Sequence, residues 1–329
     1  MLIFFLLIIF FLNIEAKTFN YYKFEDKTKE FKTCDMNTAI LTILTDEKIL
    51  FFSIISKFRN IREPMFISEV DFKGGLQVKV IEYYSFIFTK EDISVFRFRN
   101  GKIEFLKKIE EKDAIQIEKS YLNQNNPVYY IFKDNKILIY SDFFNKIKEE
   151  NFEKKLKFIS SDQDESLYKY KENEYLIFEF DPSYNLHKKD IIINEDILYF
   201  SGKGMYITKD NNENLTIYNN FEVRKKINPY KDLKKSSIKE DILRFKVNKV
   251  LPMWEKFCII GEIVYKDKPA EKRTLVYDDN YRFCKVEGPF FAEIFSVDAK
   301  ENSFSDIIFL AKHLFYYFQH GSYYSCFNF

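Results

Sequence analysis

Most of the chain alternates between short apolar stretches and charged or polar residues. Within each stretch Ile, Phe, Tyr and Val recur at every second position, and polar turns separate the stretches. A period of two built from β-branched and aromatic residues predicts antiparallel β-strands joined in hairpins. The turns of the four clearest hairpins contain Asn100, Asn135, Asn173 and Asn212. Asn is the non-glycine residue that best tolerates the left-handed backbone of tight hairpin turns.

These four asparagines are spaced by 35, 38 and 39 residues. A repeat near 40 residues in a chain made of strands is typical of a β-propeller, in which each blade takes four strands. No WD or kelch signature accompanies the repeat, so a large antiparallel sandwich or meander stays open as the alternative. The predicted fold class is all-β, with antiparallel hairpin repeats.

Two segments depart from the strand pattern. Apolar residues thin out among Lys and Glu from Phe143 to Lys157, which indicates either a helix or a charged loop. Residues 228–240 contain Pro229 and two adjacent serines and show no strand pattern, so we place a domain boundary there. We therefore expect a β-rich domain of repeated hairpins over residues 17–230 and a small C-terminal β domain over residues 241–329.

The charge balance and composition exclude several classes of protein. Among 329 residues, 51 Lys and Arg face 50 Asp and Glu, which gives a formal charge of +1. Proteins that bind nucleic acid or anionic membranes through their field need a basic excess, so no nucleic-acid partner is expected. Aromatic residues make up 19% of the chain, which excludes a disordered protein. Only 8 glycines are present, which argues against glycine-rich phosphate loops.

The chain begins with a hydrophobic segment that has the features of an export signal. Residues 2–12 are an unbroken run of Leu, Ile and Phe. This run is too short to cross a bilayer, which needs about 20 residues, but it fits the hydrophobic region of a secretory signal peptide. With Ala16 before the cut, residues 1–16 are the predicted signal peptide, and an uncleaved anchor or a buried strand are the alternatives. We expect a secreted, extracellular protein with no membrane span after cleavage.

Disulfides and a glycan are predicted from the same export premise. The four cysteines are even in number, and Cys258 and Cys284 flank two strand patterns, which favours their pairing. Cys34 would then pair with Cys326 and tie the ends of the chain together. No two cysteines have the C-x2-4-C spacing of a zinc site. Asn214, followed by Leu and Thr, is a glycosylation acceptor.

The C-terminal segment carries a series of features in a characteristic order. They are Gly261 in a strand pattern, a Lys-Pro-Ala turn from Lys268, a second strand pattern ending at Asp278, a Gly-Pro-Phe element from Gly288, and a stretch from Asp306 to His313. In this order residues 256–315 resemble the transthyretin-like family of secreted nematode proteins. The resemblance implies a small Ig-like β-sandwich with an extracellular role. Tyr265 and Phe315 stand where that family usually carries cysteines.

The sequence contains no recognisable catalytic, cofactor-binding or metal-binding constellation. A Ser-His-Asp triad needs a serine on a tight turn, and no G-x-S-x-G element is present. The three histidines are His187, His313 and His320, of which the last two are seven residues apart and more typical of an aromatic segment than of a metal site. The acidic turns at 162–165 and 278–279 do not fit the twelve-residue calcium loop, so we interpret them as solvated turns.

These observations favour a secreted, non-enzymatic β protein that binds an extracellular protein partner or a small ligand through its surface. The alternative is an extracellular hydrolase whose site is built from loops at one end of a propeller-like domain, since such a site leaves no contiguous motif.

Overall fold

The computed structural model describes residues 21–318, except for residues 38, 57–61, 124–125, 153–155, 163, 194, 203, 237–240, 254–255, 279, 288–292, 300–303 and 312–313. The expected signal peptide, His313, His320 and Cys326 lie outside this part of the chain. The described residues form antiparallel strands and one short helix, which are arranged in seven four-stranded sheets.

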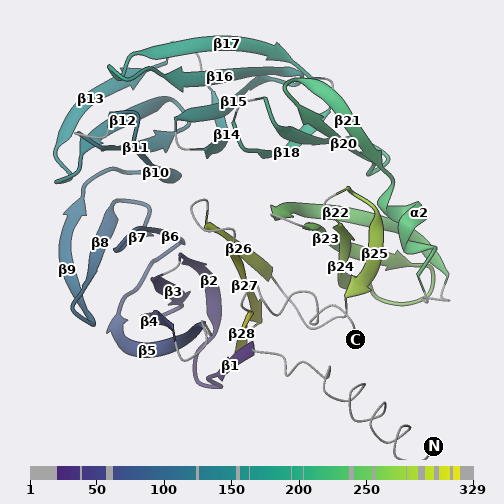
Figure 1. The fold of residues 1–329 in the computed structure, drawn as a ribbon, viewed down its shortest axis with the longest axis horizontal. Helices are drawn as coiled ribbons and strands as arrows, with labels where there is room; N and C mark the ends of the chain where they lie inside the picture. The colour runs from purple at the N-terminus through teal and green to yellow at the C-terminus, as the bar shows by residue number, and fades with distance from the viewer. Residues whose placement is uncertain are drawn as a thin grey trace, which may run out of the picture.

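Six of these sheets each take four strands that are consecutive in the sequence, and they are named blades 1 to 6 (Figure 1). Blade 1 contains β2 (Phe31–Met36), β3 (Ile40–Thr45), β4 (Lys48–Ser56) and β5 (Arg62–Asp71). Blade 2 contains β6 (Gln77–Ile81), β7 (Tyr84–Phe88), β8 (Ile93–Arg99) and β9 (Lys102–Ile109). Blade 3 contains β10 (Gln116–Ser120), β11 (Val128–Lys133), β12 (Lys136–Ser141) and β13 (Lys146–Asn151).

The remaining blades follow the same plan. Blade 4 contains β14 (Lys157–Asp162), β15 (Glu165–Lys171), β16 (Glu174–Phe180) and β17 (Leu186–Ile192). Blade 5 contains β18 (Asp196–Phe200), β19 (Tyr206–Lys209), β20 (Leu215–Asn219) and β21 (Glu222–Ile227). Blade 6 contains β22 (Ile242–Met253), β23 (Lys256–Tyr265), β24 (Glu271–Asp278) and β25 (Phe283–Glu287). Blade 7 contains β26 (Glu293–Ala299), β27 (Phe304–Ala311), β28 (Leu314–Phe318) and, from the other end of the chain, β1 (Tyr21–Glu25).

The blades succeed one another round a common axis. The first strand of each blade lies innermost, and the innermost strands of successive blades contact one another, from β2 and β6 round to β26, which contacts β2 (Figure 1). This is the architecture of a β-propeller. The predicted all-β fold class and the propeller interpretation of the repeat are confirmed: the innermost strands of blades 2 to 5 begin at residues 77, 116, 157 and 196.

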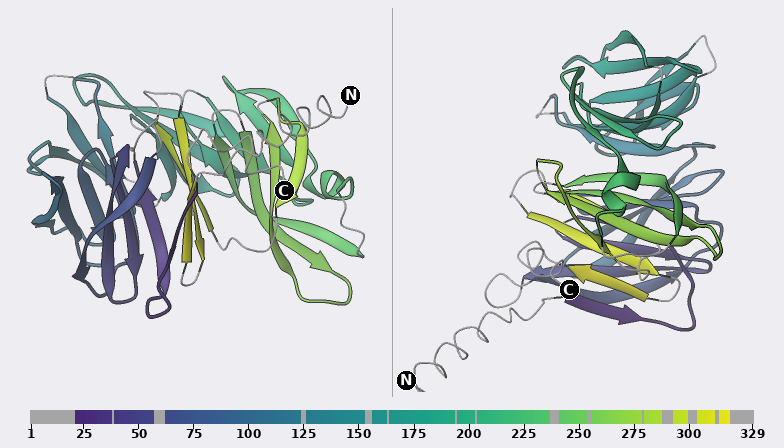
Figure 2. Two further views of the ribbon diagram at one scale, coloured as in Figure 1. Left: turned by 60° about the horizontal axis from the view of Figure 1, so that its bottom comes forward. Right: turned by 90° about the vertical axis from the view of Figure 1, so that its right-hand side faces the viewer.

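Blade 7 joins the two ends of the described chain. β1 pairs antiparallel with β28, in a register that places Tyr21 opposite Phe318 and Glu25 opposite Leu314. Figure 2 shows the strands of blade 7, in yellow and purple, beside those of blade 1. The ring is therefore closed by hydrogen bonds between segments from opposite ends of the sequence rather than by packing alone.

The segment expected to separate two domains lies between blades 5 and 6. It contains the short helix α2 (Pro229–Leu233), whose Asn228 cap accepts a hydrogen bond from the backbone N–H of Lys231 at 2.7 Å. The region that resembles transthyretin-like proteins supplies β23–β25 of blade 6 and β26 and β27 of blade 7, and blade 6 packs on blade 5. The β-sandwich implied for the C-terminal domain is wrong, because these strands belong to two separate four-stranded blades of the ring. A division into two domains and membership of the transthyretin-like family stay predictions.

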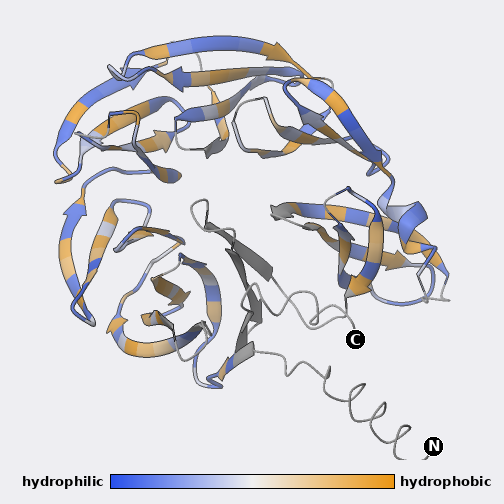
Figure 3. Ribbon diagram, in the orientation of Figure 1, coloured by the Kyte–Doolittle hydropathy of each residue, from blue (hydrophilic) through white to orange (hydrophobic). Residues whose placement is uncertain are grey.

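The charged segment from Phe143 to Lys157 is neither a helix nor a loop throughout, because residues 146–151 form the outer strand β13. The outer strands β13, β17 and β21 are rich in charged residues, as Figure 3 shows for β17 and β21. Only one edge of such a strand is paired, and lysines along the other edge protect it from joining a second molecule. Every residue of β13 is exposed or half-buried, so burial does not impose a period of two on this strand.

The core consists of apolar layers between neighbouring blades. Between blades 2 and 3, Phe86 lies 5.5 Å from Tyr129 between ring centroids, and between blades 3 and 4 Tyr130 stacks on Phe180 at 4.1 Å. Sheets that radiate from an axis leave a gap that widens outward, and large rings fill it to the packing density of a protein interior. The high aromatic content of the sequence is thus explained by packing.

Several turns hold large residues in the left-handed region. Asn100 has φ 52°, as predicted, but the other three turn asparagines do not. Instead Phe144, Tyr184 and Tyr281 adopt φ of 57°, 61° and 56°, each in the turn between the third and fourth strands of its blade. A bulky residue there is strained by about 1–2 kcal/mol, so packing must compensate.

Candidate functional site

We define the turn face as the side of the ring that carries the turns between the first and second strands and between the third and fourth strands of every blade. Because the strands are antiparallel, these turns lie at the same edge of each sheet. At the junction of blades 2 and 3 this face brings together Glu82 from the β6–β7 turn, Lys119 from the end of β10, and Asp142 from the β12–β13 turn.

Lys119 is the centre of this group. Its ammonium lies 2.8 Å from Glu82 Oε2 and 2.9 Å from Asp142 Oδ1, and its side chain is only 6% exposed. The Tyr121 hydroxyl donates a hydrogen bond to Glu82. The ammonium also lies over two aromatic rings, 5.2 Å from the centroid of Tyr129 and 5.5 Å from that of Tyr121, at the range of cation–π contacts.

The net charge of this cluster depends on whether the Lys119 side chain is protonated. Burial disfavours the ammonium, but the contacts with Glu82 and Asp142 outweigh it, so the pKa of Lys119 is raised above its ordinary value. Lys119 is therefore a cation at every physiological pH. One ammonium and two carboxylates leave the cluster with a net charge of −1, carried at the surface by carboxyl groups that are 36% and 40% exposed.

The turn that presents Asp142 is held in place by Phe144. The Phe144 ring points down between blades 2 and 3, 4.9 Å from the Tyr129 ring and 5.4 Å from that of Tyr84. This buried packing compensates for the left-handed backbone at Phe144. The Glu82 turn is also fixed, because the Asn37 amide of blade 1 donates to the Glu82 carbonyl. Three blades thus set the geometry of the cluster.

Exposed aromatic residues surround the cluster. Tyr83 is 58% exposed, Tyr121 44% and Phe143 81%, and each is within two residues of a member of the ion-pair group. Single exposed apolar residues are common, but several on turns that share one polar anchor form a patch of the kind that marks interaction sites. Beneath them, the buried hydroxyl of Tyr129 has no hydrogen-bond partner in the described structure.

A second group of polar residues lies on the innermost strands. Asp35 of β2 accepts a hydrogen bond from the backbone N–H of Val80 in β6 at 2.7 Å, and Lys79 pairs with Glu118 of β10 at 3.2 Å. Burial raises the pKa of the Asp35 carboxyl. Glu213, in the β19–β20 turn of blade 5, likewise accepts from the backbone N–H of Val247 in the innermost strand of blade 6, at 2.7 Å. These carboxylates join the edge of one blade to the next, which is a structural role.

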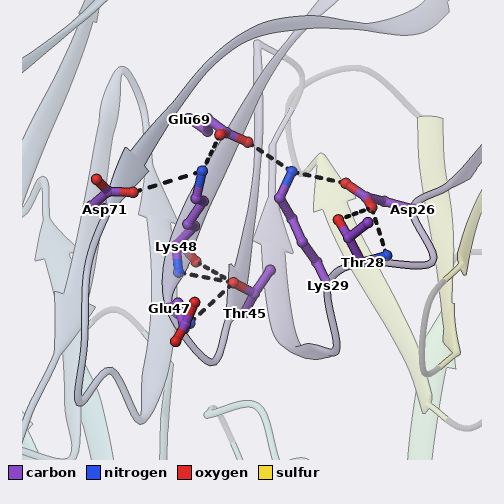
Figure 4. A network of polar contacts seen from close by, with 8 residues as sticks. All are labelled: Asp26, Thr28, Lys29, Thr45, Glu47, Lys48, Glu69 and Asp71. Atoms are coloured by element: carbon purple, nitrogen blue, oxygen red, sulfur yellow. Dashed lines mark hydrogen bonds and ion pairs between the residues drawn. The ribbon is translucent and has the colours of Figure 1, made fainter.

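A third network, shown in Figure 4, supports ring closure. Lys29, which follows β1, lies 2.8 Å from both Asp26 and Glu69, and Lys48 pairs with Glu69 and lies 3.7 Å from Asp71. Hydrogen bonds from Lys29 and Thr28 lower the pKa of Asp26 to about 2. The network ties the segment after β1 to the outer strand of blade 1.

The predicted disulfide between Cys258 and Cys284 is not formed. Cys258 lies in β23 and Cys284 in β25, and β24 runs between them, with Val276 opposite Cys258. Two strand spacings separate the Cα atoms by about 9–10 Å, which exceeds the limit of about 7 Å for a disulfide. Cys34 is buried in β2, and its pairing with Cys326 stays a prediction.

Asn214 belongs to a hydrogen-bonded turn. Its amide donates to Asp210 at 2.8 Å and its side-chain oxygen accepts from Asn228 at 2.7 Å. This gives Asn214 a structural role between β19 and β20 that the sequence did not indicate. Glycosylation at this residue stays a prediction.

The remaining candidates have local partners. His187 lies at the surface, 3.2 Å from Asp181, and Asp278 accepts the backbone N–H of Asn280 and of Arg282, as a turn residue does. Asp164 accepts the Ser120 hydroxyl of the preceding blade. The described residues include no group of three or more His, Cys, Asp or Glu side chains arranged to hold a metal ion. Nor does this part of the chain contain a helix long and apolar enough to span a membrane.

No family model and no curated protein matches the sequence. Solved structures do match the fold. The AfRom2 CNH domain has a TM-score of 0.55 at 8% identity and covers 91% of this chain and 98% of its own. Hsv2 from Kluyveromyces lactis has a TM-score of 0.51 at 9% identity, covering 88% and 98%. BBS1N, solved in complex with ARL6DN, has a TM-score of 0.51 at 10% identity, covering 91% and 97%. At these identities the similarity establishes the propeller fold alone.

Proposed function

We propose that this chain is a secreted, non-enzymatic β-propeller that binds a protein partner through its turn face at blades 2 and 3. The observation that supports this most directly is the set of exposed aromatic side chains, Tyr83, Tyr121 and Phe143, on turns that converge on Lys119. Aromatic residues are enriched at the energetic centres of protein interfaces.

The rigidity of these turns favours binding. Association carries a cost of about 0.5–1.5 kcal/mol for each flexible side chain that becomes ordered. Here Lys119 fixes two of the turns by ion pairs, and Tyr121 is held by its hydrogen bond to Glu82. A partner therefore meets a surface that is already ordered. BBS1N, a chain of similar fold, was solved bound to ARL6DN, which is consistent with a propeller acting as a protein-binding scaffold.

The extracellular part of the proposal rests on the sequence. The apolar run at residues 2–12 and Ala16 support cleavage, and the mature protein would begin at Lys17. Mass spectrometry of the protein collected from the medium tests this. An N-terminal peptide beginning at Lys17 is expected, and an intact Met1 in protein found only inside the cell would contradict export.

The binding surface is tested by cross-linking in the medium of expressing cells, with quantification of each cross-linked protein. The variant Tyr83→Ser/Phe143→Ser removes two exposed rings and leaves the ion pairs of Lys119 intact. The matched control, Phe105→Ser/Ile147→Ser, alters two side chains on outer strands that are each 56% exposed. We expect the same partner to be cross-linked by the wild type and the control and lost from the first variant. Equal loss from both variants would contradict a site on the turn face.

A further inference from the structure

We infer that the cluster at blades 2 and 3 binds an arginine side chain on an exposed segment of the partner, with Asp142 as its carboxylate and Phe143 and Tyr121 as its aromatic contacts. This inference rests on the proposed function and names the chemistry that the surface recognises. The charge of the cluster, one exposed carboxylate oxygen and the exposed aromatic rings support it separately.

Asp142 carries the carboxylate oxygen that is available to a partner. Both oxygens of Glu82 are engaged, one by Lys119 and one by Tyr121. Asp142 is different, because only Oδ1, which is buried, lies against Lys119, while the side chain as a whole is 40% exposed. The exposed part of this carboxylate is therefore Oδ2, which faces solvent at the rim of the cluster.

The charge of the cluster favours a cation. Two carboxylates against one buried ammonium leave a net charge of −1, and Lys119 cannot approach a ligand because it is almost fully covered. Two other lysines lie near this turn, and their contacts are with other groups than Asp142. Lys107 of β9 donates to the Phe144 carbonyl at 3.1 Å, and Lys146 pairs with Glu149 and lies 3.5 Å from Glu111. The exposed Asp142 carboxylate therefore attracts a cation and repels a phosphate or an acidic peptide.

A planar cation suits this surface better than a compact one. A guanidinium can stack on an aromatic ring while its N–H groups reach a carboxylate, whereas a lysine ammonium is a compact and more strongly hydrated charge. Phe143, 81% exposed, follows Asp142 in the same turn, and the Tyr121 ring lies 5.5 Å from the Lys119 ammonium. The turn thus presents an exposed ring next in sequence to an exposed carboxylate, which is a combination that suits arginine.

The protein already binds one of its own cations, Lys119, with carboxylates and aromatic rings. Lys119 is held between two carboxylates and above the rings of Tyr121 and Tyr129. Such a cation is stabilised enough to overcome its burial, since its pKa is raised. The same carboxylates and the Tyr121 ring extend to the surface, where their field acts on an external cation.

The test uses the mature full-length protein and three labelled peptides of identical Gly-Ser background, which carry two arginines, two lysines or two citrullines. Citrulline has the shape of arginine without its charge. Fluorescence anisotropy at low salt measures the affinities. We expect the arginine peptide to bind at least threefold more tightly than the lysine peptide and at least tenfold more tightly than the citrulline peptide.

Two variants test whether the arginine peptide binds at this cluster. Asp142→Asn keeps the shape of the side chain and should weaken arginine binding about tenfold, and Phe143→Leu should weaken it about threefold while leaving lysine binding nearly unchanged. Asp190→Asn, on an outer strand and 73% exposed, is the matched control and should have no effect. Circular dichroism confirms that each variant is folded.

The inference is overturned if the arginine peptide does not bind, if citrulline binds equally well, or if Asp142→Asn and Asp190→Asn behave alike. These outcomes are separate from the proposed function. If the Tyr83→Ser/Phe143→Ser variant still loses its partner while no arginine peptide binds, the turn face remains the binding surface and only its preference for arginine is refuted.

Discussion

Replacing Lys119 with Met should destabilise the protein substantially, because it leaves two carboxylates facing each other. The substitution keeps an unbranched side chain of similar length and removes only the charge. Glu82 and Asp142 both lie within 2.9 Å of the same nitrogen, so the two oxygens are less than about 6 Å apart. Without the ammonium they repel one another across a half-buried site.

The size of the effect can be worked from these distances. Two like charges about 5.5 Å apart repel by about 1.5–3 kcal/mol at an effective dielectric constant of about 20–40. Removing one partner of a fully buried pair costs about 3–5 kcal/mol, and the partial exposure of Glu82 and Asp142 reduces this. We therefore expect Lys119→Met to lower the free energy of unfolding by about 2–3 kcal/mol.

Urea denaturation followed by far-UV circular dichroism measures this free energy. The triple variant Lys119→Met/Glu82→Gln/Asp142→Asn removes the repelling charges and should recover at least half of the loss. The control Lys188→Met breaks an exposed ion pair with Asp190 and should change the free energy by less than about 1 kcal/mol. A loss below about 0.5 kcal/mol for Lys119→Met, or a triple variant no more stable than the single one, would show that the two carboxylates do not repel one another as calculated.

Three further predictions concern packing, pH and backbone conformation. A methyl group at Gly261 would lie 2.3 Å from the Lys246 carbonyl oxygen, which is too close. Gly261→Ala should therefore lower the free energy of unfolding by about 3 kcal/mol or more. An unchanged melting temperature would contradict this. The pKa of Asp26 is about 2 against an ordinary 3.8, so its stabilisation is present above pH 3.8 and is lost as the pH falls towards 2. The stability difference between wild type and Asp26→Asn, measured by urea denaturation over a pH series, should therefore shrink through that range, and a constant difference would argue against it. Phe144→Ala and Phe144→Gly both remove the buried ring, but glycine also relieves the positive φ at this position. Phe144→Gly should therefore be the more stable variant by about 1 kcal/mol in the same urea assay. The reverse order would be inconsistent with a strained turn.

The inner hairpins were predictable because burial gives them apolar stretches bounded by polar turns, whether one face or both faces of the strand are covered. The hairpin of β11 and β12, for example, has almost every residue buried between two neighbouring blades, and its two-residue turn is marked by Asp134 and Asn135. The outer strand β13 was interpreted as a helix or loop, because its one paired edge and its exposed lysines erase the alternation. The sequence thus revealed a strand where one or both faces of that strand are buried.

The repeat length was predicted correctly, but the four asparagines that defined it do not all lie in the same turn of their blades. Asn100 lies in the turn between the third and fourth strands of its blade, while Asn135, Asn173 and Asn212 lie between the second and third strands. The number of blades could not be derived from such a mixture. Closure of blade 7 was also hidden, because β1 and β28 are distant in sequence and nothing local specifies their pairing.

The candidate site was missed for a physical reason. Glu82, Lys119 and Asp142 each look like an ordinary polar residue in its own segment, and only the contact between blades brings their charges together. One signal was available: Phe143 and Phe144 are two adjacent aromatic residues in a turn, where polar residues are usual. Such a pair indicates one ring that packs inward and one that stays exposed.

The pairing of β1 with β28 also determines when the molecule can become complete. Residues 21–25 leave the ribosome before all the strands of blades 1 to 6, whereas the strand that they join is synthesised after them. Until then β1 has no neighbour in its own sheet, and blades 1 to 6 must assemble, each from local hairpins, without a closed ring. Long-range pairing of this kind is slow, so closure of the ring is expected to be the final and rate-limiting event of folding.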